Sequence, residues 1–304
     1  MNAPDLKSLH LVVLMGGPGS EREVSLRSGA AVANALRQAG HRVSEVDVKG
    51  PDFELPDGSD LSINMIHGTF GEDGQIQAIL DQRGVAYTGE GEAASRIAFD
   101  KLASKELFVR SGVPTPRSEV IAPGAKPSLP LPIVVKAPRE GSSVGVHLVR
   151  EAGQLEAALA DCANLDREIL IEELVEGREL TVGVVGDRAL AVVEIQPHEG
   201  FYDYAHKYTK GASEYFCPAP LDAETTRLVQ DTALAAHRAL GLEVYSRVDI
   251  LLHADGSPFV LEANTIPGMT ETSLLPKAAA AAGTGFLALC QEIARLSLQR
   301  SAKN

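Results

Sequence analysis

The chain begins with apolar and amphipathic segments whose order predicts a strand, a turn and a helix. An apolar run over residues 9–15 is followed by the glycine-rich segment 16–20 and then by an amphipathic segment that ends near Gly40. Ser20 and Glu23 have the S-x-x-E spacing of a capping box. The helix is therefore expected to begin directly after the glycines.

Further strand-like runs in the N-terminal third alternate with a helix-like run. Strands are predicted at 42–48, 61–66 and 84–87, and a helix at 72–82. This alternation is typical of a sheet covered by helices. The N-terminal part is therefore expected to be an open, Rossmann-like α/β domain with ligand-binding loops at the carboxyl ends of its strands.

The rest of the chain predicts two more α/β units. A helix is predicted over 94–110, and a proline-rich connector at 123–132 separates it from a strand that ends at Lys136. The other expected elements are strands at 146–149, 168–174, 180–185 and 189–195, helices at 151–162, 222–240 and 284–299, and a hairpin near 245–264. Because single cores stop growing at roughly 250–300 residues, several domains are expected. We place them at 1–94, 95–178 and 179–304.

Composition narrows the class of function. The chain has 28 Lys and Arg against 41 Asp and Glu, a net charge of −13. This argues against a nucleic-acid partner, because phosphate recognition needs a basic face. No apolar run approaches the ~20 residues that span a bilayer, and the first residues do not resemble a signal peptide. No membrane partner and a cytoplasmic location are therefore expected.

The three cysteines, Cys162, Cys217 and Cys290, have no C-x-x-C spacing. Neither a disulfide framework nor a zinc site is predicted from an odd number with this spacing. We interpret all three as small buried apolar residues.

The segment from Tyr245 to Asn264 predicts a geometry as well as a fold. Two β-rich runs flank Asp255-Gly256, a strong signal for a two-residue hairpin turn. With that turn, Asp249 faces Glu262 and Arg247 faces Asn264 on one side of the hairpin. Like charges that face each other are destabilising, so a cation is expected between the two carboxylates.

Asp249, Glu262 and Asn264 offer oxygen ligands only, which suits Mg²⁺ or Mn²⁺ and disfavours zinc. Magnesium held by few carboxylates usually completes its shell with water and substrate phosphates, so the hairpin implies a nucleotide. The alternative is a solvated hairpin face bridged by Arg247.

Two lysines are candidates for phosphate binding. Lys136 ends an apolar strand, where a lysine needs an anionic partner, and the Gly/Ser-rich loop 138–145 follows it. The loop lacks the Walker pattern, so alone it fits a flexible turn as well as a phosphate cover. Lys101 lies in the preceding helix, where a lysine is more often solvated. The acidic connector from Glu172 to Glu179 suits an adenine and a ribose, but its pattern alone favours an ordinary linker.

Three features suggest a ligand cleft without deciding its nature. Residues 201–216 hold six of the 14 aromatic residues and include Lys207. This composition fits a lid that excludes water from a phosphoryl transfer, and equally a packed Ω-loop. His67 follows an apolar strand, where a capping or core histidine is the commoner case. Glu21 lies in the first helical turn, which the helix dipole favours whatever the function.

Together these motifs resemble the ATP-grasp ligases, and most closely the D-alanine:D-alanine ligase family. The resemblance covers nearly the whole chain through GGPGSEREVSLRSG, HGTFGEDG, YTGEG, DKLASK, VVKAPREGSSVGV, EELVEGRELTVGV, FYDYAHKY and LEANTIPGMTETSLLP. It implies a three-domain ATP-grasp architecture, ATP-dependent joining of two D-alanine molecules through an acyl phosphate for peptidoglycan synthesis, and a homodimer.

The resemblance also implies residue roles around ATP and two Mg²⁺ or Mn²⁺ ions. Lys101 and Lys136 would contact the phosphates, and Lys207 would stabilise the transferring group. The adenine and ribose contacts would be Glu172, Glu173, Leu174, Val175 and Glu179. The metal ligands would be Asp249, Glu262 and Asn264.

For the amino-acid substrates, the resemblance implies that Glu21, assisted by His67, holds the first ammonium group. Ser273 and the N–H of Leu274 would take the second carboxylate, and Arg247 and the N–H of Gly268 would stabilise the oxyanion. Glu21, Ser142 and Tyr208 resemble a hydrogen-bonded triad that joins the lid to the first domain. The alternatives are an ATP-grasp ligase for another small substrate pair and a nucleotide-binding regulator without activity.

Overall fold

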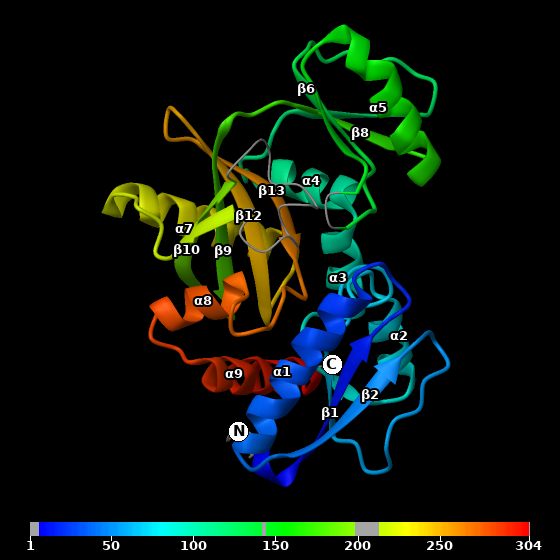
Figure 1. Cartoon of the computed structure of the whole chain (residues 1–304), viewed down its shortest axis with the longest axis vertical. Helices are drawn as coiled ribbons and strands as arrows, with labels where there is room; N and C mark the ends of the chain where they lie inside the picture. The colour runs from blue at the N-terminus through cyan, green and yellow to red at the C-terminus, as the bar shows by residue number, and fades with distance from the viewer. Residues whose placement is uncertain (1–5, 142–143, 198–212, 304) are drawn as a thin grey trace.

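The structure, a computed structural model, describes residues 6–141, 144–197 and 213–303, which form three β-sheets with helices packed against them (Figure 1). The sheets follow one another along the chain, over residues 10–87, 118–173 and 177–264. In Figure 1 the N-terminal sheet lies at the bottom, the C-terminal sheet in the middle and the central sheet at the top.

The N-terminal sheet is parallel, as expected for an open α/β unit. Its spatial order is β2 (Arg42–Val48), β1 (His10–Gly16), β3 (Leu61–Asn64) and β4 (Ala86–Tyr87), with α1 (Arg22–Gln38) and α2 (Gln75–Gln82) in its connections. Every residue of β1 is buried, as in a strand that is covered on both faces. The C-terminal helix α9 (Phe286–Ser301) packs against β3 and β4, so the two ends of the chain share one core.

The other two sheets are antiparallel. The central sheet has the order β5 (Ser118–Ile121), β8 (Ile169–Glu173), β6 (Ile133–Lys136), β7 (Val146–Val149), and α5 (Ala152–Leu165) packs against it. The C-terminal sheet has the order β11 (Ser213–Phe216), β10 (Arg188–Pro197), β9 (Gly177–Val185), β12 (Tyr245–His253), β13 (Pro258–Asn264). Helices α7 (Ala223–Ala239) and α8 (Leu274–Ala281) pack against the C-terminal sheet.

The single helix predicted over 94–110 is wrong. Two helices, α3 (Glu92–Phe99) and α4 (Lys101–Arg110), are separated by Asp100, which has an extended backbone with ψ 106°. The Asp100 carboxylate accepts a hydrogen bond from the N–H of Leu102 at 2.9 Å. Asp100 therefore ends one helix and caps the next, which places Lys101 at the first position of α4.

The predicted capping box at Ser20 and Glu23 is also wrong. Helix α1 begins at Arg22 with Glu21 as its N-cap residue, and no side chain caps it. Among the described residues, two strands and two helices lie where no element was predicted: β5 in the proline-rich region, β11 at the end of the aromatic segment, α8 in the alanine-rich region, and the short 3-10 helix η1 (Leu6–Ser8).

The cysteine prediction is confirmed for two of three residues. Cys162 and Cys290 are buried, Cys217 is partly exposed, and all three are free thiols. Among the described residues, no helix has both the length and the apolar character needed to cross a membrane.

Glu90 joins the N-terminal sheet to the C-terminal one. Its carboxylate is buried in the loop after β4 and accepts hydrogen bonds from three consecutive backbone N–H groups, those of Glu243, Val244 and Tyr245, at 2.8, 2.8 and 2.9 Å. Burial raises the pKa of Glu90 to about 6, although the three N–H groups oppose the shift. The carboxylate thus sets the start of β12, the strand that contains Arg247 and Asp249.

We expect Glu90→Ala to lower the free energy of unfolding by about 1–3 kcal/mol or more, because the substitution leaves buried N–H groups without an acceptor. Glu92→Ala is the matched control, since Glu92 forms an exposed ion pair with Arg96 and its loss should cost no more than about 0.5 kcal/mol. Urea denaturation of both variants measures the difference. Equal losses would contradict the role of Glu90.

Candidate active site

The predicted side-chain pairing of the β12–β13 hairpin is confirmed. Asp249 faces Glu262, and Arg247 faces Asn264. Residues that alternate along one strand point to the same face of the sheet. Two acidic residues are therefore neighbours on one face of the hairpin.

The hairpin reaches this register by a route that differs from the prediction. The predicted turn at Asp255 and Gly256 is wrong by one residue: the N–H of His253 bonds to the carbonyl of Ser257, so the loop covers 254–256. A bulge at Leu261 then shifts the register between Asp249 and Ile250. The longer loop and the bulge compensate each other, so the pairing beyond the bulge is the one expected.

Each of the two facing carboxylates is matched by a cation. Arg247 binds Asp249 through Nε–Oδ1 at 3.0 Å and Nη2–Oδ2 at 2.8 Å. Lys101 Nζ lies 3.1 Å from Glu262 Oε2. Thr181 Oγ1 donates a further hydrogen bond to Asp249 Oδ1 at 2.6 Å. The expected positive charge at the acidic pair is therefore supplied here by the protein itself.

The chemistry of the hairpin face suits a hard divalent cation. Asp249, Glu262 and Asn264 provide oxygen ligands on one face, and the Asn264 amide nitrogen lies 3.1 Å from Asp249 Oδ2. Among the described residues no three His, Cys, Asp or Glu side chains form a group that fits a metal ion, so the set at the hairpin consists of two carboxylates and one amide. A divalent cation would balance the charge that Arg247 and Lys101 balance in this structure.

A cavity of about 670 Å³ is lined by residues from all three parts of the chain. Several predicted site residues lie in its wall: Glu21, His67, Lys101, Arg247, Glu262, Asn264, Gly268, Ser273 and Leu274. These residues come from loops, from the starts of α4 and α8 and from the β12–β13 hairpin, which are far apart in the sequence. The structure therefore brings most of the predicted amino-acid site together in one place.

Glu21 lies at one side of this cavity, beside two glycines. A Cβ at Gly68 would lie 2.4 Å from Glu21 Oε2, and a Cβ at Gly141 would lie 3.0 Å from the same atom. Gly68 also has a φ of +67°, which disfavours residues with a side chain. The two glycines therefore let backbone from two different loops approach the Glu21 carboxylate.

Gly268 and Ser273 lie together in another part of the wall. A Cβ at Gly268 would lie 3.0 Å from Ser273 Oγ, and the N–H of Thr270 donates to that oxygen at 3.0 Å. Ser273 is the N-cap residue of α8, and Leu274 is the first residue of the helix. The first N–H groups of a helix lack intrahelical acceptors and favour an anion. This part of the cavity therefore suits a carboxylate.

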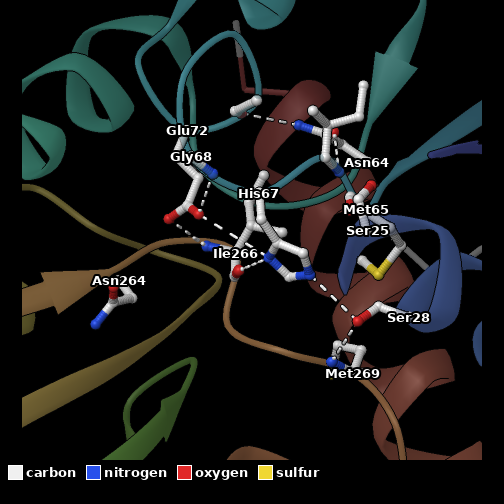
Figure 2. A network of polar contacts seen from close by, with 12 residues as sticks. Ser25, Ser28, Asn64, Met65, His67, Gly68, Glu72, Asn264, Ile266 and Met269 are labelled. Atoms are coloured by element: carbon white, nitrogen blue, oxygen red, sulfur yellow. Dashed lines mark hydrogen bonds and ion pairs between the residues drawn. The ribbon is translucent and has the colours of Figure 1, made fainter. Parts of the chain in front are cut away.

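His67 is buried, and both of its ring nitrogens have partners (Figure 2). Nδ1 lies 2.6 Å from the carbonyl oxygen of Ile266, so Nδ1 donates and Nε2 accepts from the Ser28 hydroxyl at 3.2 Å. The same hydroxyl oxygen accepts from the N–H of Met269 at 3.2 Å. Burial is the main reason why the pKa of His67 is lowered, which agrees with a neutral ring.

Glu72 completes this network from the same loop. Its two carboxyl oxygens accept from the N–H of Gly68 at 2.8 Å and of Ile266 at 3.3 Å (Figure 2). Burial raises the pKa of Glu72 to about 8, and the negative charge of Glu21 adds to the shift. His67 and Glu72 thus bind the carbonyl and the N–H of one residue, Ile266, and position the loop that leads to Gly268.

The residues expected to contact ATP lie mostly outside this cavity. Lys101 lines it, whereas Lys136 is buried at the end of β6 and forms an ion pair with Glu172. Glu173, at the end of β8, accepts a hydrogen bond from the N–H of Arg117 at 2.9 Å. Leu174 and Val175 lie in the β8–β9 connection, and Glu179 lies in β9. Ser142, Lys207 and Tyr208 lie outside the described residues.

Known proteins are similar to this chain in sequence and in fold. The family model described as the D-ala D-ala ligase C-terminus matches residues 106–295. A D-alanine–D-alanine ligase of Methylacidiphilum infernorum is 50% identical over 291 residues, with 96% of each chain covered. The chain belongs to the D-alanine–D-alanine ligase family.

Another member of the family, from Citrifermentans bemidjiense, is 44% identical over 94% of this chain and 95% of its own. The crystal structure of the Bacillus anthracis D-alanine–D-alanine ligase with ATP matches with a TM-score of 0.84 and 31% identity, covering 97% and 98% of the two chains. The VanG D-Ala:D-Ser ligase of Enterococcus faecalis matches with a TM-score of 0.85 and 27% identity, covering 95% and 99%. These matches confirm the predicted ATP-grasp fold and ligase class.

Sequence reasoning gave no role to Glu72 or to Lys105. Glu72 belongs to the His67 loop and accepts a hydrogen bond from the N–H of Ile266. Lys105 is one helical turn after Lys101 and is buried against Glu172. Neither contact follows from spacing alone, because the partners Ile266 and Glu172 lie far away in the sequence.

The raised pKa of Glu72 predicts a pH-dependent stability. Its ordinary pKa is 4.5 and its folded pKa about 8, so between these values the folded protein retains a proton that the unfolded chain releases. The contribution of Glu72 to stability is therefore greatest below pH 4.5 and decreases as the pH rises to 8.

We expect Glu72→Gln to flatten the decrease in the free energy of unfolding between pH 5 and 8, by on the order of several kcal/mol. Urea denaturation at intervals of one pH unit measures this slope. Glu106→Gln, at an exposed helix position, should leave the slope unchanged. Parallel profiles for wild type and Glu72→Gln would mean that Glu72 is ionised in the folded protein at neutral pH.

Proposed function

We propose that the protein joins two D-alanine molecules to D-alanyl-D-alanine, with conversion of ATP to ADP and phosphate, for peptidoglycan precursor synthesis. The cavity supports this proposal most directly. It places the Glu21 carboxylate, suited to an ammonium group, in the same space as Ser273 and the N-terminus of α8, suited to a carboxylate. Two small amino acids need these two kinds of contact.

In the first step, a carboxylate oxygen of the first D-alanine attacks the γ-phosphorus of ATP, and the bond to the β-phosphate oxygen breaks. The products are an acyl phosphate and ADP. Glu21 holds the ammonium group of this substrate, while Lys101 and Lys136 contribute positive charge toward the phosphates. The adenosine contacts assigned to Glu172, Glu173, Leu174, Val175 and Glu179 are part of the proposal.

In the second step, the deprotonated amine of the second D-alanine attacks the carbonyl carbon of the acyl phosphate. Negative charge develops on the carbonyl oxygen, and Arg247 and the N–H of Gly268 are placed in the cavity wall to stabilise it. Loss of phosphate then leaves the amide bond. Ser273 and the N–H of Leu274 orient the second substrate through its carboxylate.

Asp249, Glu262 and Asn264 would hold two Mg²⁺ or Mn²⁺ ions, which supply charge neutralisation for the triphosphate. The role of His67 beside the first substrate stays part of the proposal. The contacts that the structure gives to its ring indicate that it also positions the loop before Gly268. The lid and triad roles of Ser142, Lys207 and Tyr208 remain predictions, and so do the limits of the three domains.

The use of ATP and D-alanine implies small-molecule substrates and, in the same proposal, a cytoplasmic location. A homodimer is the proposed assembly. Light scattering after size-exclusion chromatography measures it: a mass near 64 kDa, about twice the 32.2 kDa of the chain, agrees with a dimer, and a mass near that of one chain contradicts it.

Phosphate release with ATP and Mg²⁺ tests the substrate assignment. We expect D-alanine alone to support rapid turnover, with at least roughly tenfold lower rates when L-alanine replaces it or when D-serine or D-lactate is offered as the second substrate. Identifying the product by mass spectrometry completes the experiment. Turnover confined to another pair would favour a ligase of different specificity, and its absence with every pair would favour the regulator.

A further inference from the structure

Lys105 is a buried lysine that the proposed mechanism does not use. It lies in α4, one turn after Lys101, with 5% of its side chain exposed, and it does not line the cavity. Its Nζ lies 2.5 Å from Glu172 Oε1 and donates to Thr115 Oγ1 at 2.8 Å. The Thr115 hydroxyl in turn donates to the carbonyl of Val260 in β13 at 2.8 Å. These contacts fix the ammonium group, so Lys105 cannot itself reach a ligand.

Glu172 lies between two lysines. Its other oxygen, Oε2, forms an ion pair with Lys136 Nζ. Strands β6 and β8 explain this pairing, because Val134 faces Glu172 and Lys136 lies two residues further along the same face. Only 2% of the Glu172 side chain is exposed, and the two lysines lower its pKa although burial opposes them.

The charges of Lys105, Glu172 and Lys136 do not cancel. Two ammonium groups and one carboxylate leave one net positive charge in a buried place, where such a charge is costly unless an anion approaches. If Lys105 were absent, Glu172 and Lys136 would form a neutral pair. Lys136 would then offer a phosphate little net attraction, although its own side chain would be unchanged.

We propose that Lys105 is a positioning residue for nucleotide binding: by neutralising Glu172 it leaves the charge of Lys136 available to a polyphosphate. The inference rests on the proposed function in one respect, that Lys136 meets the phosphates of ATP. It assigns the discrimination between phosphorylated and unphosphorylated nucleosides to a lysine that touches neither.

Equilibrium binding to the full-length protein tests this role with ATP, ADP and adenosine. We expect Lys105→Met to weaken ATP and ADP binding by roughly tenfold to a hundredfold and adenosine binding by less than about twofold. In steady-state kinetics the KM for ATP should rise while kcat changes little. Thr115→Val is the matched control, because it removes the hydroxyl contact and retains all three charges.

Two further variants separate charge from packing. Glu172→Gln removes the anion and retains both lysines, so the ratio of ADP to adenosine affinity should rise above that of the wild type. The double variant Glu172→Gln with Lys105→Met retains Lys136 and its one positive charge. Its ratio of ADP to adenosine affinity should therefore return toward the wild-type value. ADP and adenosine contain the same adenine, so the ratio of their affinities is not changed by a direct contact between Glu172 and the adenine. The same two variants test the proposal if Lys105→Met alone does not fold.

Equal losses of ATP, ADP and adenosine in Lys105→Met, or no loss in any of them, would overturn the inference. The inference would also be overturned if the double variant had the same ratio of ADP to adenosine affinity as Lys105→Met. If the wild type binds neither ATP nor ADP, the proposed function fails instead, so the two failures are distinguishable.

Discussion

The site depends on one electrostatic constraint, the placement of two carboxylates face to face across the β12–β13 hairpin. Asp249 and Glu262 repel each other in this position unless positive charge is present. In the structure Arg247 supplies it from the same strand, and Lys101 supplies it from the first position of α4. The break at Asp100 matters for this reason, because it ends α3 and allows α4 to begin with the lysine that meets Glu262.

Buried polar contacts transmit this arrangement to the rest of the cavity. Glu90 binds three N–H groups at the start of β12, and His67 and Glu72 bind both backbone groups of Ile266. All three residues belong to loops of the N-terminal sheet, whereas their partners belong to the C-terminal part. Such contacts are costly to break in a buried environment, so they hold the amino-acid side of the cavity in register with the hairpin.

Local rules were enough to predict much of the fold and the pairing of the acidic hairpin, whereas the roles given to most site residues come from the family resemblance and stay predictions. Period-2 alternation and the Asp-Gly signal predicted that Asp249 faces Glu262. The longer loop and the bulge at Leu261 shift the register of the hairpin in opposite directions, and a sequence cannot reveal either shift. The pattern predicts a continuous helix through Asp100, because an N-cap aspartate looks like any polar helix residue when periodicity continues on both sides. The roles of Glu72 and Lys105 arise from partners that only the tertiary fold supplies.

In the proposed function the acidic hairpin binds the divalent metal that accompanies the nucleotide. A crystal of the protein grown with Mn²⁺ and a non-hydrolysable ATP analogue tests it directly through anomalous scattering from manganese. We expect peaks within coordinating distance of Asp249, Glu262 and Asn264, next to the analogue's phosphates. Manganese bound to the phosphates but away from these three side chains, with Arg247 and Lys101 still paired to the two carboxylates, would contradict it.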